Sequence, residues 1–108
     1  MAVLRVGPLP GDALEAAARF HADVLPKARA LLPDPGRDGG GHLAIIFPSA
    51  PHDHRAWRLA VVESLARAAA PVRVNGIVGE GEAALAETLT FLETAPGVTG
   101  QLLAVEPA

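Results

Sequence analysis

The stretch that decides the fold runs from His54 to Val78 and reads HRAWRLAVVESLARAAAPVRVNGIV. Its first part has the apolar spacing of a helix, with two apolar stripes side by side. The stripes are Trp57, Val61, Leu65 and Ala68, and Leu59, Val62, Ala66 and Ala69. Pro71 ends this helix because proline has no N–H to donate and disfavours a helical residue before it. The β-branched run over 72–78 then predicts a buried strand. A helix that feeds a buried strand through a short connection is half of a βαβ unit.

Further strands and helices are predicted on either side of this stretch. The strands span 2–6, 42–47, 72–78 and 101–105, and the helices span 12–32, 54–69 and 82–94. The strands are short apolar runs without alternation, as expected for a parallel sheet covered on both faces. Joined by right-handed crossovers, they predict one small open, mainly parallel, four-stranded α/β sheet with three helices in three layers.

Local signals add three expectations. Asp12 has the form of an N-cap for the first helix, and Pro26 should kink or split that helix. Ser49 or Asp53 can cap the central helix. The glycine- and proline-rich segment 33–41 is expected to be the most mobile internal loop.

Composition sets the class of protein. The chain has 108 residues, of which 50% are apolar and 19% charged, so one globular domain over 1–108 is expected. It has no Cys, which excludes disulfides, thiol catalysis and Cys-ligated zinc, and no Tyr, which excludes a phenol as acid or base. A net charge of −3 gives no basic footprint for nucleic acid. No apolar run is long enough to span a membrane and no signal peptide is evident, so a cytoplasmic protein is expected.

Several segments together resemble the short-chain dehydrogenases/reductases. The segment from Arg55 to Ala66, followed by Ala70-Pro71-Val72-Arg73-Val74-Asn75, is similar to the helix and strand after that family's active site. The tail from Phe91 to Val105, with Thr99-Gly100-Gln101, is similar to its C-terminal end. Val24-Leu25-Pro26 and Gly40 to Ile46 are similar to its interface helix and to the strand that carries its catalytic serine. The resemblance runs from about Leu14 to Val105 and implies a truncated, incomplete Rossmann-like domain.

The chain departs from that family where chemistry is needed. The family binds its dinucleotide with a glycine-rich turn, but Gly7-Pro8-Leu9-Pro10-Gly11 has the wrong spacing and its prolines remove donors. The family's catalytic tyrosine and lysine fall at Pro51 and Arg55 when positions are counted back from Pro71. Proline cannot transfer a proton, and arginine cannot tune its pKa as lysine can. We therefore expect no catalytic residues, no cofactor and no oxidoreductase activity.

A metal site is not expected either. His52-Asp53-His54 is the most tempting cluster, but residues two apart at a helix start do not converge, and no further ligand is evident. A solvated first turn is the favoured interpretation. His21 lies on an apolar helix face and is interpreted as a core or interface histidine.

Two classes of function remain open. The favoured one is a non-catalytic module that self-associates or binds a partner protein. The alternative is a small-molecule or nucleotide site at the carboxyl ends of the strands, where open α/β sheets bind ligands. Its candidate residues are Ser49, His52, His54, Arg55, Asn75 and Gly79. A screen for ligands that raise the melting temperature would separate the two classes.

For the first class we expect a homodimer through the helices over 12–32 and 54–69. The central helix is apolar on two sides, and one sheet face covers only one of them. In the family that the chain resembles, the equivalent helices form a four-helix interface between subunits. The predicted interface residues are Leu14, Ala18, His21, Leu25, Trp57, Leu59, Val62 and Ala66.

Overall fold

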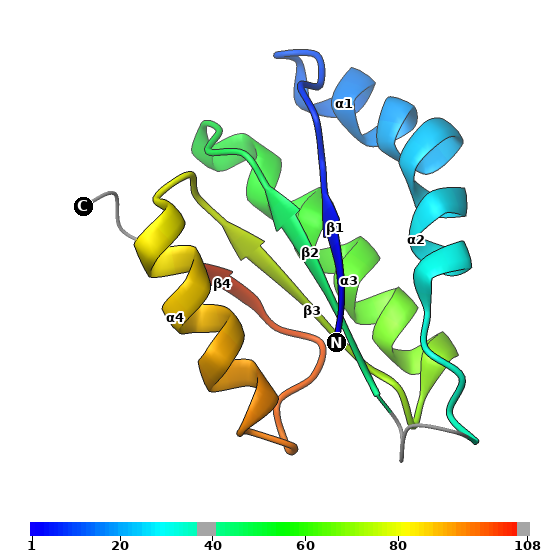
Figure 1. Cartoon of the computed structure of the whole chain (residues 1–108). Coiled ribbons are helices and arrows are strands. Elements are labelled where there is room, and N and C mark those ends of the chain that lie inside the picture. Colours follow the sequence, from blue (N-terminus) through cyan, green and yellow to red (C-terminus); the bar gives the residue numbers. More distant parts are fainter. Residues whose placement is uncertain (37–40, 106–108) are drawn as a thin grey trace.

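The computed structural model describes residues 1–36 and 41–105 and contains one four-stranded sheet (Figure 1). The strands are β1 (Ala2–Arg5), β2 (His42–Phe47), β3 (Arg73–Val78) and β4 (Leu102–Ala104). They lie in the order β1-β2-β3-β4, and every neighbouring pair is parallel. The predicted parallel α/β sheet is therefore confirmed, with each strand inside or close to its predicted range.

The first helix is divided by a π-helical turn. It consists of α1 (Ala13–Arg19), the π-helix η1 (Phe20–Val24) and α2 (Leu25–Leu31). Asp12 caps its start as predicted, because its side chain accepts a hydrogen bond of 2.9 Å from the Glu15 N–H. Pro26 lies in the first turn of α2, directly after the π-helix. The predicted split at Pro26 thus takes the form of a π-helical turn, which is wider than an α-helical turn. This turn accommodates the proline, which lacks an N–H.

The buried side chains of the first helix differ in part from the predicted apolar face. The sequence placed Leu14, Ala18 and His21 on the apolar face, but Leu14 is 81% exposed and the other two are also exposed. Ala16 and Phe20 are buried instead, whereas Ala28, which was predicted on the apolar face, is buried as expected. The extra residue in the π-turn rotates the helix after it, so a single 3.6-residue period does not describe the whole segment.

The central and last helices follow their predictions closely. They are α3 (Arg55–Ala69), which follows the 3₁₀-helix η2 (His52–His54), and α4 (Glu82–Glu93). Neither Ser49 nor Asp53 caps α3, because His54 holds the N-cap position and makes no side-chain cap. That part of the prediction was wrong, because the 3₁₀ turn places the helix start beyond both residues.

The three helices form two layers around the sheet. The first helix and α3 cover one face, whereas α4 covers the other (Figure 1). The first core cluster joins Phe20 and Val62 to Phe47, and the second joins Leu85 and Leu92 to other sheet residues. Every crossover steps one strand in the same direction, so the crossover through α4 has the opposite hand to the other two. Three right-handed crossovers would have placed all helices on one face.

Two remaining expectations concern loops and membranes. Of the predicted mobile loop 33–41, residues 37–40 lie outside those that the structure describes. Among the helices of the described ranges, none has the length and apolar character that a membrane crossing requires.

Candidate functional site

The loops after the strands enclose a pocket at the carboxyl edge of the sheet, where open α/β sheets bind ligands. This carboxyl-edge pocket has a volume of about 380 Å³ and lies between the loop after β1 and the loop after β2. It is lined by Val6–Gly11, Pro48–Pro51, His54 and Arg58. A smaller pocket of about 160 Å³ shares Arg58 and extends towards Leu102 and Ala104 of β4.

Arg58 is a buried cation beside this pocket. Its side chain is only 4% exposed, and its Nη1 donates a hydrogen bond of 2.8 Å to the carbonyl oxygen of Pro48. Its guanidinium carbon lies 4.9 Å from the ring centre of Phe47 and 5.6 Å from that of Trp57. Within the described ranges Nε has no hydrogen-bond partner and Arg58 makes no ion pair. Burial lowers the pKa of Arg58 below its usual value.

The sequence analysis did not identify Arg58. The available signal was its position three and four residues before Val61 and Val62, on the buried face of the helix. A charged residue at such a position is rarely buried without a partner.

His54 is buried and holds the loops around the pocket. Trp57 Nε1 donates to its Nδ1 at 3.2 Å, so Nδ1 is an acceptor and Nε2 carries the proton. That Nε2 lies 2.9 Å from the carbonyl oxygen of Gly11 and donates to it. The histidine predicted as a ligand residue thus links the loop after β1 to the start of α3, with both ring nitrogens in use.

Ser49 is engaged with an acidic residue from the next loop. Its hydroxyl and backbone N–H donate to the Glu80 carboxylate at 2.7 Å and 2.8 Å. These bonds, the hydroxyl first, hold the pKa of the Glu80 carboxyl below its usual range. Ser49 therefore ties the loop after β2 to the loop after β3 and has no histidine or lysine in contact with its hydroxyl among the described residues.

The remaining predicted ligand residues at this edge differ in accessibility. His52 and Arg55 are exposed and line the smaller pocket. Gly79 is buried with a φ of 147°, and a Cβ there would collide with Val105. Gly79 is therefore required for packing against the end of β4, so it lies in the backbone that supports the edge.

Asn75 lies away from these residues, which corrects its assignment to the same site. It is completely buried on the α4 face, and its amide donates to Nε2 of His42 at 3.0 Å and to the carbonyl oxygen of Val98 at 2.9 Å. Its Oδ1 accepts from the Gln101 N–H at 3.0 Å. Because His42 begins β2, this network lies towards the amino ends of the strands. Asn75 serves the structure there by satisfying buried polar groups.

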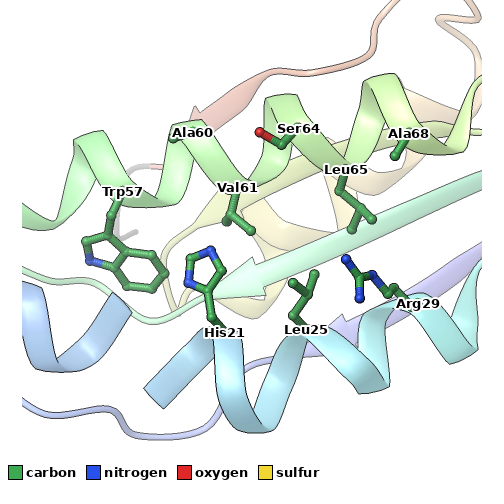
Figure 2. A pocket seen from close by; sticks show the side chains of 9 residues that line it. All are labelled: His21, Leu25, Arg29, Trp57, Ala60, Val61, Ser64, Leu65 and Ala68. Atoms are coloured by element: carbon green, nitrogen blue, oxygen red, sulfur yellow. The ribbon is translucent and has the colours of Figure 1, made fainter. Parts of the chain in front are cut away.

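A second hollow lies between the first helix and α3. Figure 2 shows side chains from the two helices facing each other across it. Its volume is about 450 Å³, and its lining consists of His21, Leu25, Arg29, Trp57, Ala60, Val61, Ser64, Leu65 and Ala68. We call this hollow the helix groove.

The helix groove contains only some of the predicted interface residues. Leu25 and Trp57 are half-buried, and Trp57 packs its ring 5.4 Å from that of Phe20. Val62 and Ala66 were predicted to form part of the dimer interface, but they are 0% and 8% exposed and pack against the sheet. They cannot form a surface, because the sheet covers the second stripe.

Leu59 belongs to the same side of α3 as Val62 and is half-buried against the core. The exposed side of α3 instead presents small side chains one turn apart, at Ala56, Ala60, Ser64 and Ala68. These residues, together with the exposed Leu14, Ala18 and His21 of the first helix, form the outer helical surface of the protein.

Metal ligands do not gather anywhere in the described ranges, where no group of three His, Cys, Asp or Glu side chains is placed to hold an ion. His52, Asp53 and His54 do not converge, since His54 points inward to Gly11 and the other two are exposed.

Comparison with known proteins gives one match. The family model described as SDR-like, short chain dehydrogenase-like protein, matches residues 4–105. No curated protein and no solved structure matches the chain.

Proposed function

The chain belongs to the short chain dehydrogenase-like family, and on that premise we propose that it is a non-catalytic member that self-associates through its outer helical surface. The observation that carries this proposal is the helix groove with its exposed surroundings, which the sheet does not cover. We further propose that the protein acts in the cytoplasm, which fits its lack of Cys.

The shape of the outer helical surface supports a helix-to-helix contact. Ala56, Ala60, Ser64 and Ala68 recur every fourth residue of α3 and are all exposed. Small side chains at this spacing allow another helix to approach closely. The first helix, which forms the other wall of the helix groove, also carries Leu14, which is 81% exposed. A twofold axis along the groove would bring two copies of each helix together and cover this leucine.

The charges around the groove are compatible with a copy of the same surface. Arg29 lines the groove, whereas Glu63 and Arg67 flank the small residues of α3 and are exposed. Because both signs are present, a twofold contact can place acidic groups against basic ones. Arg19 and Asp23, 3.8 Å apart, form an ion pair on the outer side of the first helix.

The residues at the catalytic positions support the loss of chemistry. Pro51 holds the N-cap of η2, and Arg55 is exposed at the start of α3. The chain contains no Tyr that could replace the missing phenol from elsewhere. The hydroxyl of Ser49 donates to Glu80, so this serine has no partner of the kind that the family's proton transfer uses.

Sedimentation velocity at micromolar concentration tests the proposal. We expect a species of twice the 11.1 kDa chain mass. A stable interface of this kind would bury about 1,200–2,000 Å² in total. A single species with the mass of one chain would refute self-association.

A small-molecule site is the second candidate function. The observation that favours it is the carboxyl-edge pocket, whose volume of about 380 Å³ falls within the range of ligand sites. This site and the outer helical surface are formed by different residues, although α3 contributes residues to both. The two functions can therefore be tested separately.

A further inference from the structure

We propose that the carboxyl-edge pocket binds a small organic carboxylate with an apolar body, and that the carboxylate pairs with the guanidinium of Arg58. This inference rests on the second candidate function and specifies its ligand class. It does not depend on self-association.

The unpaired state of Arg58 is the first argument. A buried charge is costly unless an opposite charge or hydrogen-bond acceptors compensate it. The rings of Phe47 and Trp57 stabilise the cation through its flat face, and Pro48 satisfies Nη1. Neither ring accepts a hydrogen bond at the edge of the guanidinium, and Nε remains without an acceptor in the described ranges.

A carboxylate is a suitable partner for this guanidinium, which lines the pocket and has no acidic partner among the described residues. Its two oxygens accept hydrogen bonds from two guanidinium nitrogens in one plane, in a geometry that is both directional and charge-assisted. Among the described residues no acidic side chain pairs with Arg58, and the two ion pairs found there join other residues. A ligand carboxylate would thus supply an acceptor that the described residues do not provide.

The lining of the pocket indicates the rest of the ligand. Pro8, Leu9, Pro10, Pro48, Ala50 and Pro51 present mainly apolar atoms. A pocket of about 380 Å³ with such walls favours a compact apolar body over a sugar or a nucleotide. The buried His54 donates its only ring N–H to the carbonyl oxygen of Gly11, so this N–H is already engaged within the protein.

The same lining argues against a phosphate group. Phosphate sites use several backbone N–H groups, often at a glycine-rich turn. Four of the lining residues are prolines without N–H groups, and the N–H of Ser49 already donates to Glu80. The carboxylate of Glu80 next to Ser49 would repel a phosphate dianion more strongly than a carboxylate monoanion.

Hexanoate is a suitable probe, and hexanamide is its neutral match. In ¹⁵N-labelled full-length protein, hexanoate should shift the amide signals of Gly7, Gly11 and Ala50 and the Nε–H signal of Arg58 in a saturable way at millimolar concentration. Hexanamide and inorganic phosphate should bind at least about tenfold more weakly. Equal binding of hexanamide, tighter binding of phosphate, or no saturable shift with hexanoate would overturn the proposal.

Two variants test the role of charge in different ways. Arg58→Lys keeps the charge but loses the planar pair of donors, and Ala50→Asp adds a repelling charge at an exposed lining position without altering Arg58. Each should weaken hexanoate binding at least about tenfold, whereas Ala86→Glu on the exposed side of α4 should not. If Arg58→Lys fails to fold, Ala50→Asp still tests the proposal. An unchanged affinity of Ala50→Asp for hexanoate would contradict it.

Failure of this site can be distinguished from failure of self-association. Ala60→Glu lies on the outer helical surface and should leave hexanoate binding unchanged even if it alters sedimentation. Loss of hexanoate binding in Ala60→Glu would instead indicate that the pocket depends on the assembled state, which would overturn the independence argued above.

Discussion

The side-chain amide of Asn75 donates a hydrogen bond to Nε2 of His42 at 3.0 Å, and this bond requires a neutral imidazole. A protonated Nε2 would point a second donor at the amide nitrogen. The rest of the network leaves Asn75 no alternative, because its second amide N–H donates to Val98 and its oxygen accepts from Gln101. The central strands are therefore joined by a buried bond that is sensitive to pH.

The stability of the fold should decrease between neutral and mildly acidic pH because of His42. Burial, followed by the charge of Arg73, lowers the pKa of His42 from 6.5 to about 4 in the folded protein. Between these values the unfolded chain binds a proton that the folded chain does not, so the free energy of unfolding falls as pH falls, by at most about 1.4 kcal/mol per pH unit. Urea unfolding at a series of pH values measures the slope.

The matched variant for this test is His42→Gln, which keeps an acceptor for Asn75 but does not titrate. In this variant the free energy of unfolding should change less steeply with pH than in the natural chain, by an amount that corresponds to at most one proton. The other three histidines contribute equally to both proteins. Identical slopes would show that His42 does not cause the pH dependence.

Charge on the exposed side of α3 should prevent self-association. Ala60→Glu places a carboxylate among the small residues of α3, where the proposed contact would bury it without a partner. We expect the dimer dissociation constant to rise at least about a hundredfold, or about 3 kcal/mol, by sedimentation velocity. Ala86→Glu, at a position of α4 that is also exposed, is the control and should leave the constant unchanged.

A charge at Val62 is not an equivalent test. Val62 is completely buried against the sheet, so Val62→Glu should unfold the chain itself, whatever its state of association. A folded, monomeric Val62→Glu variant would show that this side of α3 is not packed against the sheet.

Gly79 should be intolerant of a side chain. Its φ of 147° is unfavourable for other residues, and a Cβ would collide with Val105. Gly79→Ala should lower the free energy of unfolding by about 1–3 kcal/mol in urea titrations. Gly97→Ala is the matched control, because no atom lies within 4 Å of its added Cβ, and its effect should be near zero. Equal losses in the two variants would contradict this account.

The protein should show neither NADPH binding nor oxidoreductase activity. By the resemblance to the family, the tyrosine and lysine positions are expected at Pro51 and Arg55, and Gly7 to Gly11 lacks the spacing of a dinucleotide turn. Isothermal titration calorimetry with NADPH should give no saturable heat at micromolar concentration. Micromolar binding, or turnover of a carbonyl substrate with NADPH, would refute the non-catalytic assignment.

The fold was largely predictable because each element carries a strong local signal. The apolar run over 42–47 and the run after Pro71 became β2 and β3, and Asp12 capped the first helix as its position suggested. The buried face of the first helix was not predictable from a constant period, since the π-turn over Phe20–Val24 shifts it. The sequence also did not reveal on which face of the sheet α4 packs, because the leucine stripe of α4 would fit either face.

The candidate site was only partly predictable. His54, Ser49 and Arg55 lie at the carboxyl edge as expected, because they follow β2 directly in the chain. Asn75 was misplaced because it was assigned by resemblance, whereas its depth within β3 puts it near His42. Arg58 was overlooked because its burial depends on packing against Phe47, a contact between residues of different elements.

The placement of α4 opposite α3 has a consequence for how β2 finds its register. Beyond His42, both faces of β2 are apolar and buried, so hydrophobicity alone does not distinguish them. Side-chain volume does: Leu43, Ile45 and Phe47 fill the space beneath α3, whereas Ala44 and Ile46 meet the layer of α4. A slip of one residue would leave a cavity in one layer and overfill the other. The pairing of β2 is therefore encoded in the different side-chain volumes of its two faces, with Leu43 and Phe47 on one face and Ala44 on the other.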